Sequence, residues 1–257
     1  MTANRPRVLG VEITPGGRDA HLELIHEYLS QEGGILHVVT ANPEYLMTAR
    51  EDPVFAGAVN SAGLVTVDGA GLAIAMRLLH PNVDSSRYTG VQLTADMARL
   101  SSDIGVTLFL LGAGPGIAGR AAEKLLVDQP AARFAGMWSD GSPRPEDDAE
   151  TIRRIRDSGA SILLVAYGAP AQIYWIDRNL AALEAAGIRV VAGIGGAFDY
   201  ISGNVPYAPP LVRKLGLEWL YRLVREPWRW RRQLVLPHFV ILVMWEFLRT
   251  RLRRGVE

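Results

Sequence analysis

LHVVTANPEYL (residues 36–46) and LVTVDGAG (residues 64–71) are two segments of one kind, separated by a spacer of helical character. Each begins with an apolar run rich in β-branched residues, which is typical of a buried strand in a parallel sheet. Each run ends abruptly in polar residues, with Thr40 and Asn42 after the first and Asp68 after the second. Ligands of open parallel α/β sheets bind beyond the carboxyl ends of the strands. We therefore expect these three side chains to converge on one crevice.

The same alternation of apolar run, turn and helical stretch continues as far as residue 208. Further strands are expected near residues 106–111, 133–136, 162–166 and 189–191. Residues 7–13 alternate weakly and form one more candidate strand. This pattern predicts an α/β fold with a Rossmann-like parallel sheet flanked by helices.

Composition excludes several classes of site. Hydrophobic residues make up 49% of the 257 residues, which is enough for a large core, and cysteine is absent. The chain therefore has no disulfide, thiolate metal site or cysteine nucleophile. The N-terminus lacks the apolar run of a signal peptide, so we expect a cytoplasmic protein or one that faces the cytoplasm.

The net charge of zero hides a strong asymmetry. Residues 213–254 hold eleven Lys or Arg against three Asp or Glu, and four of the six Trp lie in the same region. This composition predicts a helical segment over residues 209–257, distinct from a core of residues 1–208, that meets an anionic surface. We expect Pro227 and Pro237 to break it into short helices. The apolar run 234–248 is shorter than the roughly 20 residues that span a bilayer, so it fits an element lying against the membrane interface.

The polar strand ends allow two interpretations. Asp68 could be a general base, because its carboxylate would point into the crevice. An aspartate before GAGLA is also a typical helix N-cap. Thr40 and Asn42 could bind a ligand, although Asn42 before Pro43 is equally typical of a cap.

Three glycine-rich turns follow later strands. GAGPG (112–116) offers Gly112 and Gly114 for close approach to a phosphate, but Ile117 stands where a dinucleotide fingerprint needs its third glycine. A dinucleotide-dependent oxidoreductase is therefore a weak alternative. The second turn, YGAPAQ (167–172), contains Gln172, whose amide could bind a ligand or could simply be exposed in the first turn of a helix. The third turn contains Gly195.

Taken together, the motifs resemble the WecG/TagA/CpsF glycosyltransferases, also called glycosyltransferase family 26. They occur in family order from Arg7 to about Leu248 and read TANPEYL (40–46), VDGAG (67–71), GAGPG (112–116), YGAPAQ (167–172), GIGGAFDYISG (193–203) and LGLEWLYRLVREPWR (215–229). The resemblance implies a Rossmann-like core with a C-terminal appendage that targets the membrane and helps to close the site.

The resemblance also implies an activity. Family members at the cytoplasmic membrane face move a sugar of the N-acetylmannosamine type from a UDP-sugar to a polyprenyl-diphosphate-linked sugar, with inversion and without a metal. The expected partners are thus the two substrates and an anionic membrane surface, and we expect no cofactor and no nucleic acid. The sequence leaves open whether the protein forms a homo-oligomer. A non-catalytic membrane adaptor that keeps a degenerate sugar-nucleotide fold is the main alternative.

Matched position by position, the resemblance assigns Asp68 as the base that deprotonates the acceptor hydroxyl. The expected substrate-binding residues are Thr40, Asn42, Arg87 of a mobile loop, Gly112, Gly114, Gln172, Gly195, and the arginines Arg222, Arg229 and Arg232 for diphosphate. The chain departs from the family pattern at Ser86 and Ile173, where glutamate is usual, and at Tyr207, where a basic residue is usual. These departures affect what the resemblance implies about the sugar that is transferred and about the contacts of the loop that carries Arg87.

Overall fold

The computed structural model describes residues 5–31, 33–227, 230 and 234–254. Its centre is a six-stranded sheet in the order β4-β3-β8-β7-β5-β6. Every neighbouring pair in it is parallel. The strands are β3 (Leu36–Ala41), β4 (Leu64–Val67), β5 (Thr107–Gly112), β6 (Arg133–Trp138), β7 (Ile162–Ala166) and β8 (Val190–Gly193). The predicted parallel α/β sheet is confirmed.

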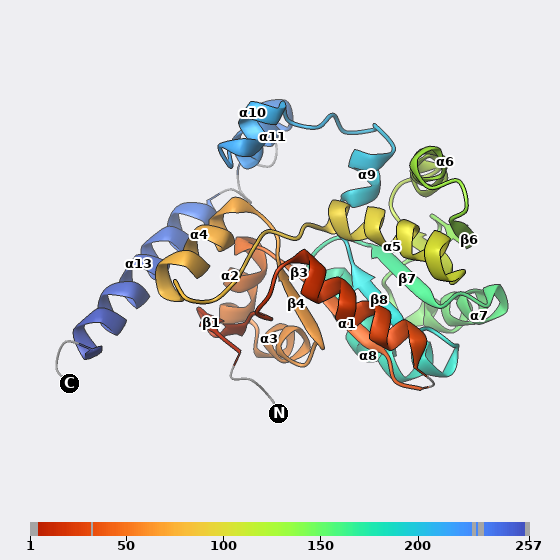
Figure 1. The fold of residues 1–257 in the computed structure, drawn as a ribbon, viewed down its shortest axis with the longest axis horizontal. Helices are drawn as coiled ribbons and strands as arrows, with labels where there is room; N and C mark the ends of the chain where they lie inside the picture. Colours follow the sequence, from red (N-terminus) through yellow and green to blue (C-terminus); the bar gives the residue numbers. More distant parts are fainter. Residues whose placement is uncertain (1–4, 32, 228–229, 231–233, 255–257) are drawn as a thin grey trace.

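Helices cover both faces of the sheet (Figure 1) because alternate residues of each strand pack on opposite sides. In β3, Val38 packs in one core cluster and Val39 in another. The first face carries α1 (Arg18–Ser30), α5 (Gly90–Ile104), α6 (Ile117–Asp128) and α9 (Ala197–Ile201). The second carries α2 (Pro43–Glu51), α3 (Pro53–Asn60), α4 (Ala70–Leu79), α7 (Asp148–Ser158) and α8 (Ala171–Ala185), with a 3₁₀ turn at Pro145–Asp147 before α7.

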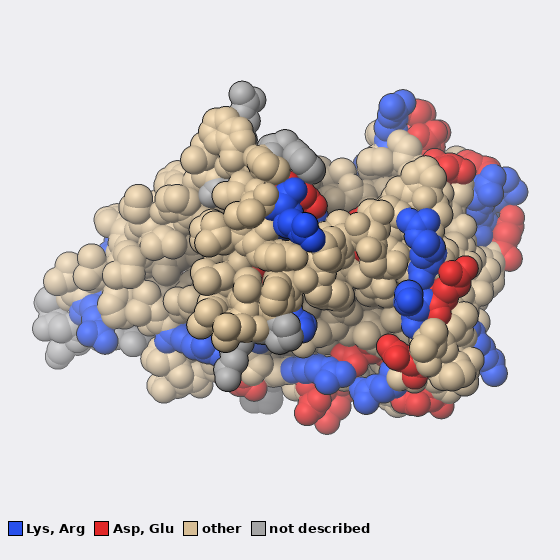
Figure 2. Space-filling model, turned by 90° about the horizontal axis from the view of Figure 1, so that it is seen from above, with Lys and Arg blue, Asp and Glu red and all other residues tan. Residues whose placement is uncertain are grey.

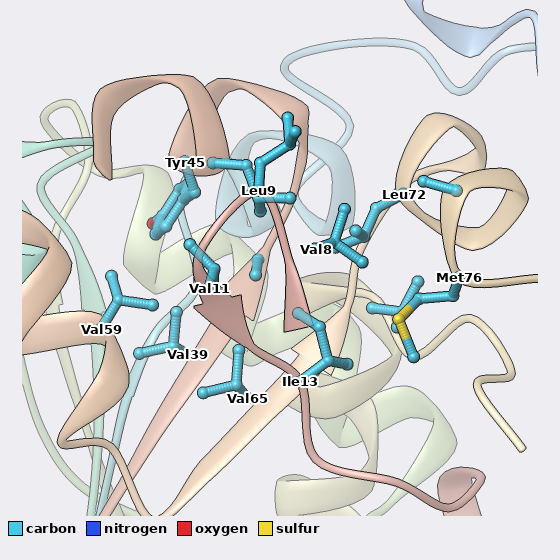
Figure 3. Packing of buried hydrophobic residues seen from close by; sticks show 14 of the residues in the cluster. Val8, Leu9, Val11, Ile13, Val39, Tyr45, Val59, Val65, Leu72 and Met76 are labelled. Atoms are coloured by element: carbon cyan, nitrogen blue, oxygen red, sulfur yellow. The ribbon is translucent and has the colours of Figure 1, made fainter. Parts of the chain in front are cut away.

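The candidate strand at residues 7–13 is instead a short antiparallel hairpin of β1 (Arg7–Val8) and β2 (Val11–Glu12). Its turn, Leu9 and Gly10, has φ values of 50° and 90°. The hairpin lies outside the main sheet, and its apolar side chains Val8, Val11 and Ile13 pack onto the core between α2, α4 and the sheet (Figure 3). Its alternation therefore reflects one buried face rather than a seventh strand.

The C-terminal segment (residues 209–257) contains α10 (Pro210–Lys214), α11 (Glu218–Arg225) and α13 (Val235–Arg254). Helix α11 ends before Pro227, as expected, but the expected break at Pro237 is wrong. Pro237 lies in the first turn of the 20-residue helix α13, where a backbone N–H has no partner within the helix. The division of the chain at residue 209 stays a prediction.

Helix α13 is attached to the core by one face. Phe239 and Val243 are buried in the same cluster as residues of α2 and α4. The Glu246 carboxylate accepts a hydrogen bond from the Leu9 backbone N–H at 3.1 Å. The opposite face is an exposed apolar stripe, made up of Val240, Ile241, Met244, Trp245, Leu248 and Leu252. Among the described residues, no helix has the length and apolar character needed to cross a membrane.

Candidate active site

The carboxyl ends of β3, β4, β7 and β8 open into one cavity of about 1660 Å³. Thr40, Asn42 and Asp68 all line it, so the structure brings together the three polar strand-end residues. Residues of α11 and the apolar start of α13 complete its wall. The C-terminal segment thus contributes part of the same site as the sheet.

Asp68 does not cap the helix that follows it. Gly69 holds the N-cap position of α4, and no side chain caps that helix. The Asp68 carboxylate instead accepts a hydrogen bond from the Gly90 N–H at 3.3 Å, at the start of α5. Glycine is needed at position 90, because a Cβ there would lie 2.9 Å from the Ile194 carbonyl oxygen. Burial raises the pKa of Asp68 to about 6, against the opposing effects of the Gly90 hydrogen bond and the positive charge of Arg87.

Thr40 and Asn42 each have a local structural partner. The buried Thr40 hydroxyl donates to the Gly193 carbonyl at 3.0 Å and so ties β3 to β8. Asn42 is the N-cap of α2, where its side-chain oxygen accepts from the Tyr45 N–H at 3.2 Å. The cap interpretation of Asn42 is therefore confirmed. Because Asn42 also lines the cavity, capping fixes its side chain at the wall of the cavity that Asp68 also lines.

Arg87 connects the sheet to the C-terminal segment. Its backbone pairs with Val67 beside β4. Its guanidinium donates to the Glu218 carboxylate of α11 at 2.7 Å. The Arg87 Nε atom is buried, and no acceptor reaches it within the part of the chain that the structure describes. Glu218 therefore holds one terminal nitrogen of the Arg87 guanidinium, Nη2, at the cavity wall.

Glu218 also affects Asp68 electrostatically, because its negative charge raises the pKa of Asp68. Glu218→Gln removes this charge, so we expect the pKa of Asp68 to fall. If Asp68 must be ionised to act, the acid limb of the pH profile of kcat moves to lower pH. Arg87→Gln should move the same limb to higher pH, because it removes a nearby positive charge. Shifts of the limb in the same direction for both variants would contradict this coupling.

Gln172 is fully buried, so it is not the exposed residue of a first helical turn that one interpretation predicted. Its amide nitrogen donates to the Tyr45 hydroxyl at 2.6 Å. Its amide oxygen accepts from the N–H groups of Gly168 and Gly195, each at 3.1 Å. One side chain thus holds two strand-end turns in place at the cavity wall.

Gln172→Leu should destabilise the fold, because the backbone N–H groups of Gly168 and Gly195 lose their acceptor. With a cost of about 1–3 kcal/mol for each of the two unsatisfied donors, we expect a loss of roughly 2–6 kcal/mol in the free energy of unfolding, measured in urea. The matched control is Gln31→Leu at an exposed position. Equal unfolding midpoints for the two variants would show that Gln172 has no such role.

The glycines fall into two groups. Gly195 lines the cavity and has a φ of 56°, in the left-handed region. Gly112 and Gly114 lie at the end of β5 and do not line this cavity. A Cβ at Gly112 would lie 2.9 Å from the Tyr167 ring and 3.1 Å from the Ala166 backbone. Close packing of β5 on β7 therefore accounts for Gly112 without a ligand.

Among the described residues of the C-terminal segment, three arginines line the cavity: Arg213, Arg222 and Arg225. Arg222 lies over the Tyr200 ring at 5.2 Å and pairs with Glu226 at 3.3 Å. The predicted Arg229 and Arg232 lie outside the described residues. Sequence reasoning missed Arg213 and Glu218 as lining residues. The excess of basic residues was a signal for Arg213, but none marked Glu218.

Comparison with known proteins identifies the family. Residues 6–253 match the sequence profile described as the Glycosyl transferase WecG/TagA/CpsF family. The chain belongs to this family. As a member of the WecG/TagA/CpsF family it is a glycosyltransferase, and the oxidoreductase and adaptor alternatives are set aside.

Two curated relatives are similar over most of the chain. One, from Bacillus spizizenii strain W23, is 33% identical over 88% of this chain and 84% of its own. The other, from Bacillus subtilis strain 168, is 30% identical over 85% of this chain and 82% of its own. Both are named N-acetylglucosaminyldiphosphoundecaprenol N-acetyl-beta-D-mannosaminyltransferase.

Proposed function

We propose that this glycosyltransferase moves a sugar from a UDP-sugar to a saccharide linked to a polyprenyl diphosphate, as a step of cell-surface polysaccharide biosynthesis. The transferred sugar is N-acetylmannosamine, its uronic acid or a related hexose. The names of the two relatives support the acceptor class and the N-acetylmannosamine type of donor sugar. The observation that carries the proposal is Asp68, a carboxylate with a raised pKa, in the same cavity as a group of arginines.

In this reaction Asp68 is the general base. Its carboxylate takes the proton of the acceptor hydroxyl while that oxygen attacks the anomeric carbon of the donor. The bond from the anomeric carbon to the UDP oxygen breaks, and UDP leaves with the electron pair. A single displacement inverts the anomeric centre. A pKa of about 6 supports this role, since the group is mostly ionised at neutral pH yet basic enough to accept a proton.

The departing diphosphate needs positive charge that is already in place. Arg222 and Arg213 come from the C-terminal segment, and Arg87 comes from the loop before α5. Guanidinium groups bind diphosphate oxygens in forked pairs and so stabilise the charge that develops as UDP leaves. We propose that these arginines, rather than a metal ion, neutralise the leaving group.

The apolar stripe of α13 supports a place at the membrane. Trp245, Leu248 and Leu252 are exposed on one face of the helix, and Arg249 lies beside the stripe over the Trp245 ring. Exposed apolar and aromatic side chains next to arginines are typical of helices that lie in an anionic membrane interface. We propose that α13 holds the enzyme on the cytoplasmic face, and Leu252→Glu should then reduce sedimentation with anionic vesicles.

UDP release tests the function. The protein is incubated with a panel of UDP-sugars, with and without an acceptor of GlcNAc linked to a prenyl diphosphate, and with and without EDTA. We expect one donor to release UDP only when the acceptor is present, and EDTA to have no effect. Loss of release in EDTA would overturn the metal-independent step. If no donor releases UDP and UDP itself does not bind, the proposed function is wrong.

A further inference from the structure

One end of the active-site cavity is apolar. Helices α4 and α13 contribute uncharged lining residues there, among them Ile74, Phe239, Val240 and Ile241. The residues Ile74, Val240 and Ile241 are 62%, 56% and 66% exposed. Figure 2 shows that, among the residues that the structure describes, few charged side chains lie on the visible face of the half with α4, α10, α11 and α13. Exposed apolar patches of this kind mark binding surfaces.

This apolar end is continuous with the catalytic end. Asp68 lies two residues before α4 begins at Ala70, and Ile74 lies one turn further along, about 6 Å away along the helix axis. Ala70 and Ile74 line the same cavity as Asp68 and Arg222. The cavity therefore changes from a carboxylate and arginines at one end to aliphatic side chains at the other.

A charged end followed by an aliphatic end fits a lipid that carries a saccharide on a diphosphate. A saccharide needs the base, a diphosphate needs the arginines, and a hydrocarbon chain gains free energy from burial against aliphatic side chains. We propose that the first isoprene units of the acceptor lipid lie in a prenyl groove at this apolar end of the cavity, lined by Ile74 of α4 and by Val240 and Ile241 of α13. This inference rests on the proposed function and names the surface that holds the lipid part of that acceptor.

The prenyl groove also has an exit. Val240 and Ile241 begin the apolar stripe of α13, which continues through Met244 and Leu248 to Leu252. A prenyl chain that leaves the groove along this stripe stays in contact with apolar side chains. Because the same stripe is the proposed membrane contact, the remainder of the chain would pass from the groove to the bilayer along these apolar side chains.

Binding of two probes tests the groove in buffer without vesicles. Farnesyl diphosphate and methyl diphosphate share the diphosphate and differ in the hydrocarbon. We expect the wild-type protein to bind farnesyl diphosphate at least about tenfold more tightly, since burying one large aliphatic group contributes roughly 1.5 kcal/mol or more. Ile74→Glu and Ile241→Glu should each remove most of this preference and leave the affinity for methyl diphosphate within about twofold of wild type.

Val127→Glu is the matched control, because it also replaces an exposed aliphatic side chain by glutamate, but on α6 and away from the cavity lining and the stripe of α13. It should keep the farnesyl preference. Equal affinity of the wild-type protein for the two probes would overturn the prenyl groove, as would a preference that survives both groove variants or is lost in the control. These results are independent of the transfer assay. Protein that prefers farnesyl diphosphate but transfers no sugar overturns the proposed function alone.

Discussion

Asp68→Asn is expected to lower kcat by about 10³-fold, within the range that general-base catalysis contributes. The substitution keeps the size of the side chain, and the amide oxygen can still accept the Gly90 N–H bond. It removes only the ability to take a proton from the acceptor hydroxyl. KM for both substrates should therefore change little. Initial rates of UDP release at saturating donor and acceptor give the comparison.

Stability separates this loss of activity from unfolding. The native pKa of about 6 lies above the ordinary carboxyl value of about 4, so stability falls as pH rises through that interval and Asp68 ionises. Asparagine carries no charge and avoids this cost, so the variant should resist urea at neutral pH at least as well as the wild type. Asp103→Asn, at an exposed site on α5, is the matched control for activity. Full activity of Asp68→Asn would show that Asp68 is not the general base.

Arg222→Ala is expected to lower kcat by about 100-fold, the scale of losing one fixed group that stabilises charge in a transition state. Arg222 lines the cavity and is held by the Tyr200 ring and by Glu226, so its charge is in place before the diphosphate departs. The affinity for UDP should weaken as well, because the product carries the same diphosphate. Steady-state kinetics and titration with UDP measure the two effects.

Arg154→Ala is the control for Arg222→Ala. Arg154 lies over the Trp138 ring at 4.6 Å, a contact of the same kind as that of Arg222 with Tyr200, but it does not line the cavity. It should leave kcat unchanged. Arg222→Lys should recover part of the activity, since a point charge replaces the forked guanidinium. Equal rates for Arg222→Ala and the wild type would mean that Arg222 does not meet the leaving group.

Much of the parallel sheet could be predicted because short stretches of sequence mark its strands and the points where they end. The apolar runs at residues 36–39 and 64–67 are too short and too β-branched for helices, and their polar ends indicate where the sheet opens. Parallel strands place all their carboxyl ends on one edge, so Thr40, Asn42 and Asp68 follow from strand positions alone. Asn42 before Pro43 has a local signal for its cap as well, and the structure confirms it.

Other features depend on contacts between distant parts of the chain, which no local pattern records. Glu218 reaches Arg87 across 131 residues. Asp68 looks like a cap in the sequence, but its partner is Gly90 on another helix. Gln172 looks like an exposed residue, yet its buried amide joins turns that follow two different strands. Pro237 was expected to break a helix, since its place in the first turn of α13 depends on where that helix begins.

The most direct test of sugar transfer by Asp68 is the mass of the acceptor lipid after incubation. Wild-type protein, a UDP-sugar donor and GlcNAc linked to a prenyl diphosphate should yield a lipid heavier by one sugar residue. Asp68→Asn should yield almost none over the same time. An unchanged acceptor mass with every donor, or the same yield of product from Asp68→Asn and wild type, would contradict a base-assisted transfer in this cavity.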